Sequence, residues 1–162
     1  MTTGPVVPAA DDIGLLCLVV SNGFSNRVLA SLADAGFGDA RFSHGFIVQG
    51  LLAGDTTVTE LAERLGISIQ AVSKTVKEME SLGYLERKRD AGDARSSRLA
   101  LSEKGQANLA ASRAARAEVM AALRKSLGKK RMRELTDLLR LAAGEFGGLE
   151  SLAGRRVRPL DG

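Results

Sequence analysis

Four side chains that can form hydrogen bonds lie close together in the sequence, at Gln70, Ser73, Lys74 and Lys77. Their spacing of one to four residues places them on one broad face of a helix. A glutamine amide can pair bidentately with adenine, a lysine ammonium can reach guanine or a phosphate, and a serine hydroxyl can do either. The pattern therefore indicates non-covalent recognition of duplex DNA.

These side chains lie on a predicted helix that is bounded by Ser68 and Gly83. Ser68 is a good N-cap, Ile67 and Val72 have the spacing of a hydrophobic staple, and glycine is a common helix terminator. Between these ends, apolar residues recur at helical intervals, at Ile69, Val72, Val76, Met79 and Leu82. The pattern predicts an amphipathic helix whose N-terminal amides can also bind phosphate.

A shorter helix is predicted just before it, over residues 60–65, and Gly66 ends that helix. Thr57 and Glu60 have the capping-box spacing, while Thr59 is a competing cap. Two short helices joined by a tight turn form a helix-turn-helix, which places its second helix in the major groove of DNA. We expect its small core to contain Leu61, Leu65, Ile69, Val72 and Val76. We expect its outward face to contain Gln70, Ala71, Ser73, Lys74 and Lys77.

A basic hairpin is predicted next, with strands over residues 84–89 and 95–101. Its positive residues are Arg87, Lys88, Arg89, Arg95 and Arg98. A protruding arginine suits the narrow minor groove, where negative potential is enhanced, and we expect Arg95 to take this place. Asp93 could pair with Arg95 and fix its direction, and Arg98 is expected to contact phosphate. The hairpin disfavours the alternative for residues 68–82, an ordinary amphipathic surface helix.

This order of elements resembles the MarR family of bacterial transcription regulators over residues 11–147. The most specific stretches are Val58–Ser68, Ala71–Lys74, Leu82–Arg87, Asp93–Arg95 and Leu99–Gly105. The Asp-x-Arg wing followed by Leu-x-Leu-Ser-Glu-Lys-Gly is more typical of this family than of other winged helices. The resemblance implies an obligate homodimer that binds a pseudo-palindromic operator in double-stranded DNA and is released by a small molecule or an oxidant.

The implied fold class is mainly α (α+β), a winged helix-turn-helix with a helical dimerisation domain, about six helices and a two- to three-stranded wing sheet. The DNA-binding domain is expected over residues 55–101. The dimerisation domain is expected over residues 11–54 and 102–147. Residues 1–10 are expected to be a disordered lead-in and residues 148–162 a loose tail.

Apolar stripes outside the winged module also indicate a dimer. The first helix carries Ile13, Cys17, Val20, Phe24, Val28 and Leu32 at steps of three or four. Two later segments, which Gly128 separates, carry Ala110, Ala114, Ala117 and Ala121, and then Met132, Leu135, Leu139, Ala142 and Phe146. So small a winged module cannot cover all of these stripes, and exposed stripes of this length need a partner.

Cys17 and three polar residues are candidates for regulation. One branch of the MarR family senses organic hydroperoxides through a cysteine in the first helix, but it pairs that cysteine with tyrosines where this chain has Ser43 and Phe46. Cys17 therefore has two interpretations, a packed thiol and an oxidant trigger, and we expect the first. A small anionic or aromatic effector has its candidate ligands in His44, Arg27 and Arg41, although a structural role is the expected one for His44.

Charge is unevenly distributed along the 162 residues, whose formal net charge is +4. Residues 1–58 hold two of the 23 basic and five of the 19 acidic residues, so the remainder is basic. The densest positive stretch contains Arg124, Lys125, Lys129, Lys130, Arg131 and Arg133. Because that cluster lies at a helix-to-helix turn away from the wing, we expect a solvated face there and not a nucleic-acid contact.

Several functional classes are disfavoured by residues that the sequence lacks. One Cys and one His cannot build the usual structural zinc site or an internal disulfide. Phosphate-binding glycine loops and metalloprotease motifs are missing, and no uninterrupted apolar run approaches the ~20 residues that span a bilayer. We therefore expect a non-enzymatic cytoplasmic repressor with no metal, cofactor or membrane partner. The alternative from another class is a winged-helix module that binds protein instead of DNA.

Overall fold

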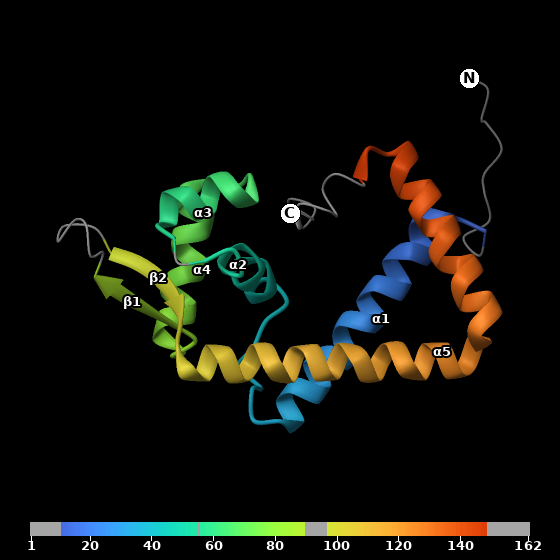
Figure 1. Cartoon of the computed structure of the whole chain (residues 1–162), viewed down its shortest axis with the longest axis horizontal. Helices are drawn as coiled ribbons and strands as arrows, with labels where there is room; N and C mark the ends of the chain where they lie inside the picture. The colour runs from blue at the N-terminus through green and yellow to red at the C-terminus, as the bar shows by residue number, and fades with distance from the viewer. Residues whose placement is uncertain (1–10, 55, 90–96, 149–162) are drawn as a thin grey trace, which may run out of the picture.

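The computed structural model describes residues 11–54, 56–89 and 97–148 (Figure 1). Its elements are α1 (Ile13–Asp34), α2 (His44–Leu51), α3 (Val58–Leu65), α4 (Ile69–Ser81), β1 (Leu85–Arg89), β2 (Ser97–Leu101) and α5 (Glu103–Glu145). Helices α2 to α4 and the hairpin form a winged module at one end of the molecule, and α1 crosses α5 beside it (Figure 1). The mainly helical fold class with a small wing sheet is confirmed.

The helix-turn-helix begins and ends where the local sequence signals predict. The Glu60 N–H donates to the Thr57 hydroxyl at 3.2 Å, and the Thr57 N–H donates to Glu60 Oε2 at 3.0 Å. This capping box starts α3, so the N-cap is Thr57 and not the alternative, Thr59. Gly66 ends α3 with a left-handed backbone (φ 66°), which a residue without a Cβ adopts readily. Ser68 then caps α4 by accepting from the Ala71 N–H at 3.2 Å.

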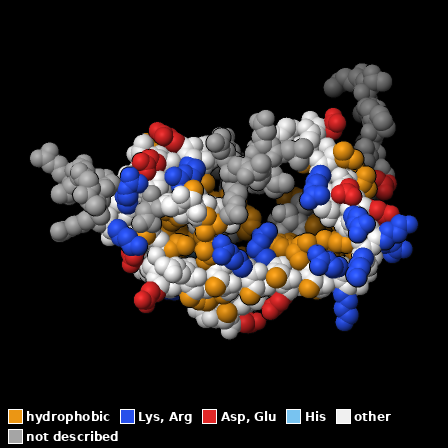
Figure 2. Space-filling model, in the orientation of Figure 1, with side chains coloured by type: hydrophobic (Ala, Val, Ile, Leu, Met, Phe, Trp, Pro, Cys, Tyr) orange, Lys and Arg blue, Asp and Glu red, His pale blue; other side chains and the backbone are white. Residues whose placement is uncertain are grey.

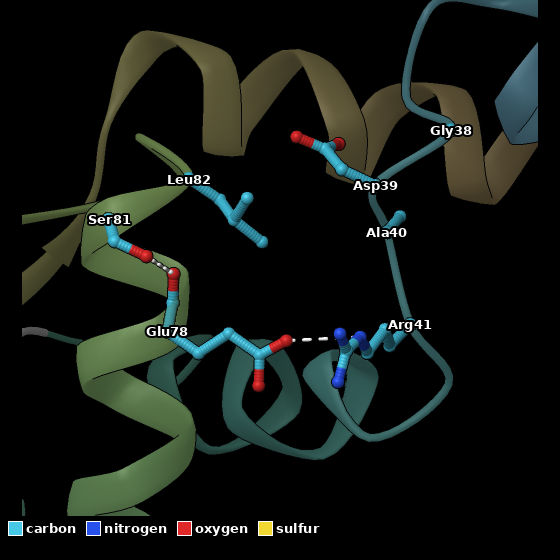
Figure 3. A pocket seen from close by; sticks show the side chains of 7 residues that line it. All are labelled: Gly38, Asp39, Ala40, Arg41, Glu78, Ser81 and Leu82. Carbon is cyan, nitrogen blue, oxygen red and sulfur yellow. Dashed lines mark hydrogen bonds and ion pairs between the residues drawn. The ribbon is translucent and has the colours of Figure 1, made fainter.

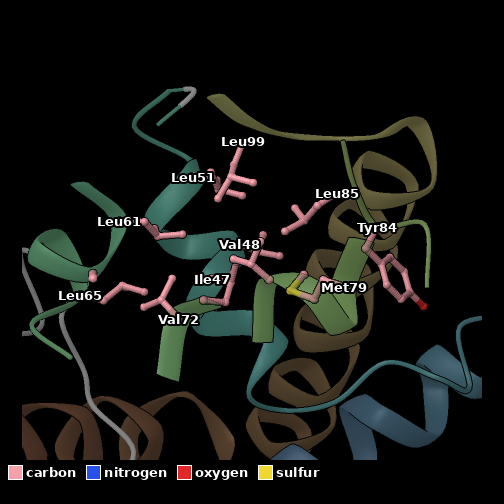
Figure 4. Packing of buried hydrophobic residues seen from close by; sticks show 12 residues of the cluster. Ile47, Val48, Leu51, Leu61, Leu65, Val72, Met79, Tyr84, Leu85 and Leu99 are labelled. Atoms are coloured by element: carbon pink, nitrogen blue, oxygen red, sulfur yellow. The ribbon is translucent and has the colours of Figure 1, made fainter. Parts of the chain in front are cut away.

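The winged module has its own hydrophobic core (Figure 4). Four of the five core residues predicted from the helix-turn-helix pattern are buried, namely Leu61, Leu65, Val72 and Val76. The fifth prediction is wrong, because Ile69 is 51% exposed. Ile67 packs against the core at the start of α4 instead, so the hydrophobic staple leaves no place for Ile69. Further core residues come from α2, α3, α4, the hairpin and the residue before it: Ile47, Val48, Leu51, Ala62, Met79, Tyr84, Leu85 and Leu99.

The wing is an antiparallel pair of strands that begins with Leu85 opposite Leu101. Thr56, just before α3, adds a single bridge to Leu99, whose N–H donates to the Thr56 carbonyl at 2.7 Å. Leu99 and Thr56 are both fully buried. The bridge therefore fastens the base of the wing to the helix-turn-helix.

Helix α5 is interrupted at Gly128, as the sequence predicts. Gly128 has φ 76° and ψ 162°, a backbone that lies outside the helical region and that residues with a Cβ rarely adopt. Figure 1 shows that α5 turns sharply and continues in a different direction. The described residues thus contain six helical segments when the two parts of α5 are counted separately.

Helix α1 packs against α5 through its C-terminal half, where Val28 and Leu32 are buried together with Ala115. The N-terminal half of α1 is open to solvent in the single chain, and Ile13 is 71% exposed. Cys17 is exposed there as well, so the expected packed thiol does not form within one chain. By length and composition α1 could span a membrane, which is weak evidence because the core helices of soluble proteins and signal sequences pass the same test.

Candidate nucleic-acid interface

Helix α4 has one buried and one solvent-facing side. Val72, Val76 and Met79 are buried against the module core. On the other side Gln70, Ala71, Lys74 and Lys77 are exposed, and Ser73 is half-buried. We call Gln70, Ser73, Lys74 and Lys77 the polar ridge. The polar ridge faces solvent along a short, capped helix, and a helix exposed in this way has the shape that can enter the major groove of DNA.

The two lysines of the polar ridge are not neutralised. In the described part of the chain, neither Lys74 nor Lys77 has an acidic partner. The acidic residues of the same helix are engaged elsewhere, Glu78 with Arg41 at 3.0 Å and Glu80 with Arg87 at 2.7 Å. The two ammonium groups of the ridge are therefore available to phosphate oxygens.

The basic hairpin is organised by acidic partners that sequence reasoning missed. Arg87 Nε donates to Glu80 Oε1 at 2.7 Å, and its Nη1 donates to the Ser97 hydroxyl at 3.1 Å. Lys88 Nζ lies 3.6 Å from Glu86 Oε1. The contact with Glu80 joins β1 to α4 and holds the arginine against the helix end. Glu80 and Arg87 are seven residues apart in the sequence with a turn between them, and this spacing does not predict an ion pair.

Arg98, on β2, lies beside the capping box of α3. Its Nη1 is 3.6 Å from Glu60 Oε2, which also accepts from the Thr56 hydroxyl at 2.7 Å. Hydrogen bonds from the Thr57 N–H and the Thr56 hydroxyl, followed by the Arg98 charge, hold the pKa of Glu60 below its ordinary value. A phosphate contact by Arg98 stays a prediction. Asp93 and Arg95, the predicted tip of the wing, lie outside the described residues.

His44 lies buried at the start of α2. It is 4% exposed, and its Nδ1 accepts from the Arg41 N–H at 3.2 Å. Its Nε2 lies 3.6 Å from Glu78 Oε1, the oxygen that Arg41 Nε approaches at 3.0 Å. Burial lowers the pKa of His44 below its ordinary value, and the Glu78 carboxylate opposes that shift. The three residues join the α1–α2 loop to the buried flank of α4.

An open hollow of about 540 Å³ lies beside this contact (Figure 3). It is lined by Gly38, Asp39, Ala40, Arg41, Glu78, Ser81 and Leu82. Of the three effector candidates, Arg41 lines the hollow, whereas His44 is buried behind it. Arg27 is exposed on α1 and does not line it.

A second polar contact beside the hollow was also missed from the sequence. Asp39 accepts a hydrogen bond from the Tyr84 hydroxyl and lies 2.9 Å from Lys104 Nζ. These two donors lower the pKa of Asp39, while burial and the Asp39 carboxylate raise that of Tyr84 above its ordinary range. The partners are 45 and 65 residues away along the chain, too far for any local pattern to indicate.

Among the residues that the structure describes, no group of three His, Cys, Asp or Glu side chains could hold a metal ion. The exposed Cys17 lies in the N-terminal half of α1, outside the winged module. The side chains that α4 and the hairpin present to solvent offer hydrogen bonds and positive charge.

Comparison with known proteins agrees with this geometry. Residues 50–96, from the end of α2 through the helix-turn-helix to the wing, match the sequence model of the MarR family. This segment is therefore similar to the MarR family. A comparison with curated protein sequences gave no match.

Solved MarR structures extend the likeness to the whole described chain. Reduced MarR from E. coli shares 20% identity, with 86% of this chain and 98% of that chain covered and a TM-score of 0.65. A MarR family protein from Bacillus stearothermophilus shares 21%, with 86% and 96% covered and the same TM-score. A transcriptional regulator from Thermotoga maritima shares 23%, with 84% and 94% covered and a TM-score of 0.58. The chain thus has the winged-helix fold of MarR regulators.

Proposed function

We propose that the chain is a homodimeric transcription repressor of the MarR type, cytoplasmic and without enzymatic activity. The observation that carries this proposal is the polar ridge of α4, whose Lys74 and Lys77 lack acidic partners in the described structure, beside a basic hairpin on the same module. Residues 55–101 form the DNA-binding part of the proposed regulator, and residues 11–54 with 102–147 form its dimerisation part.

Each residue of the interface has a proposed role. Gln70 and Ser73 read base edges in the major groove, while Lys74, Lys77 and Arg98 contact phosphates. Ser68 caps α4 so that its remaining N-terminal amides face a phosphate, and the exposed Ala71 lets the groove wall approach closely. Arg95 enters the minor groove and Asp93 orients it, roles that rest on the sequence pattern.

Titration of duplex DNA with the protein tests this function. The probes are the DNA upstream of the chain's own gene and a random-sequence duplex, compared by fluorescence anisotropy at fixed salt. Arg95→Ala is expected to weaken operator binding while leaving the unfolding curve unchanged. Lys77→Ala is expected to weaken both probes and to lower the salt slope by about one ion. Equal and weak binding of both probes by the unsubstituted protein would favour the protein-interaction module instead.

The proposed dimer rests on apolar surface that one chain leaves uncovered. Val19 and Val20 of α1 are 68% and 62% exposed, and Leu138 and Leu141 of α5 are 64% and 69% exposed. Figure 2 shows hydrophobic side chains open to solvent where α1 and α5 cross. Continuous apolar surface of this kind is typical of an interface. A twofold dimer would place two α4 helices about 34 Å apart, one turn of DNA.

The dimer is tested by light scattering after size exclusion. The full chain is expected to elute as a dimer, and Leu141→Asp is expected to shift it toward the monomer. Lys125→Asp, a charge change on an exposed side chain of the same helix, is the matched control and should stay dimeric. A monomer at all concentrations would contradict the dimer.

The proposed regulator also has a candidate effector site. The hollow lined by Arg41 and Glu78 is the site we propose for a small ligand, with the Arg41 guanidinium as the group that binds an anion or an aromatic acid. The alternative trigger is oxidation of Cys17, whose exposure in the single chain makes it accessible. A Cys17→Ser protein that still leaves DNA after peroxide treatment would eliminate that alternative.

A further inference from the structure

Ile69 is the first residue of α4, and 51% of its surface is exposed. Ile69 is not part of the module core, because Ile67 packs at the start of the helix against the cluster that contains Val72. Its sequence neighbours, the N-cap Ser68 and the ridge residue Gln70, are both exposed and polar. A large branched apolar side chain thus stands open to water among hydrogen-bonding groups, and the fold of one chain gives no reason for it.

Its position on α4 indicates what could cover it. Ile69 lies one helical turn before Ser73, on the edge of the polar ridge. The N-terminal residues of a recognition helix are those that contact base edges. The major-groove edges of base pairs carry hydrogen-bonding groups at every base, and thymine adds an apolar group, its C5 methyl.

We infer that Ile69 is a specificity-determining residue that contacts the C5 methyl of a thymine where the N-terminus of α4 enters the major groove. The inference rests on the proposed DNA-binding function and adds a base preference to it. On contact the isoleucine side chain and the thymine methyl leave water together, which stabilises the complex. Cytosine carries only a hydrogen at C5, so at that position this apolar contact would be lost.

The surroundings favour DNA over a second protein chain as the occupant. The apolar surface proposed for dimerisation lies on α1 and α5, whereas Ile69 lies on the winged module (Figure 1). The polar-ridge residues Gln70, Ser73 and Lys74 follow Ile69 on the same helix, a set that fits base edges and phosphate. A phosphate backbone supplies the negative charge that complements Lys74 and Lys77, whereas a protein partner would have to carry acidic side chains at both positions.

The test replaces thymine by deoxyuracil, which removes the C5 methyl and keeps every hydrogen-bonding group. The probe is the duplex that the full chain selects from a random-sequence pool, with each thymine of a half-site replaced in turn. At one thymine per half-site, deoxyuracil is expected to weaken binding by the unsubstituted protein about four-fold. Ile69→Ala is expected to bind the thymine and uracil duplexes alike, and Ile69→Val to keep most of the discrimination.

Controls separate this inference from a general loss of binding. Lys77→Ala should bind more weakly but keep the full thymine-to-uracil ratio. The midpoint of unfolding of Ile69→Ala should equal that of the parent, because the side chain is exposed. The inference is overturned if no thymine shows a uracil effect, or if Ile69→Ala keeps the same ratio as the parent. Selection of no duplex at all would overturn the proposed DNA-binding function itself, and the inference with it.

Discussion

Lys104 Nζ, at the start of α5, lies 2.9 Å from Asp39 Oδ2 in the loop between α1 and α2. The same ammonium donates to the Leu82 carbonyl at 2.8 Å and lies 4.3 Å from the centre of the Tyr84 ring. The α1–α2 loop, the end of α4 and the start of α5 therefore meet at one lysine. Because α4 carries the proposed DNA contacts and α5 the proposed dimer contacts, this junction fixes how the two surfaces are oriented.

Removal of the carboxylate at this junction should destabilise the fold. Asp39→Ala leaves Lys104 and the Tyr84 hydroxyl without their shared acceptor. Since Asp39 is itself exposed, we expect a loss of about 1 kcal/mol in the free energy of unfolding, or about 3 °C in Tm. Tyr84→Phe, which keeps the ring over Lys104, should lose less. Urea unfolding followed by circular dichroism measures both, and equal stability of Asp39→Ala and the parent would contradict the junction's role.

His44 should make the protein less stable in mild acid. Its pKa is lowered from 6.5 by burial, so the folded state binds the proton less readily than the unfolded chain does. The stability that follows from this difference is present above pH 6.5 and is lost as the pH falls through the pKa of the folded state. The difference in free energy of unfolding between the parent and His44→Gln should therefore shrink from about pH 8 to about pH 5. If the urea midpoints of the parent and of His44→Gln fall by the same amount over this pH range, the prediction is wrong.

Local signals explain why most of the winged module could be predicted. Thr57, Gly66 and Ser68 act through hydrogen bonds or backbone angles within a few residues, so their roles can be read from sequence alone. The burial of Val72 and Val76 follows from helical periodicity. Ile69 fits the same periodicity but is exposed, because the neighbouring Ile67 already packs at that end of the helix. Helical periodicity predicts which residues share a face of α4, but tertiary packing determines which of those residues are buried.

Contacts that depend on tertiary structure could not be predicted. The Asp39 acceptor for Tyr84 and Lys104 joins three segments far apart in the chain. The Glu80–Arg87 pair depends on the angle at which β1 leaves α4. Residue types alone gave the cations that are candidates for DNA binding, but they did not indicate which of those cations are held by carboxylates.

Gly105 is expected to tolerate no side chain. A Cβ there would lie 2.1 Å from the Tyr84 carbonyl oxygen, a backbone atom that cannot move without shifting the hairpin. Gly105→Ala should therefore lower the free energy of unfolding by more than about 2 kcal/mol, as overpacking does in a tight core. Gly45→Ala is the matched control, since a Cβ on this α2 residue meets nothing within 4 Å, and it should raise stability by up to about 1 kcal/mol. Thermal unfolding of the two variants compares them directly, and a Gly105→Ala protein as stable as the parent would show that the hairpin can shift without cost.

Release of Arg87 from Glu80 should increase non-specific binding to DNA. Glu80 Oε1 lies 2.7 Å from Arg87 Nε, so one hairpin cation is neutralised at the edge of the proposed interface. Glu80→Gln removes that charge and leaves the arginine free to reach phosphate. We expect affinity for a random-sequence duplex to rise about three-fold and the salt slope to steepen by about one ion. Glu134→Gln, which removes the partner of Lys130 on α5, is the matched control and should change neither value. Weaker binding by Glu80→Gln would mean that the carboxylate positions Arg87 for DNA and does not compete with it.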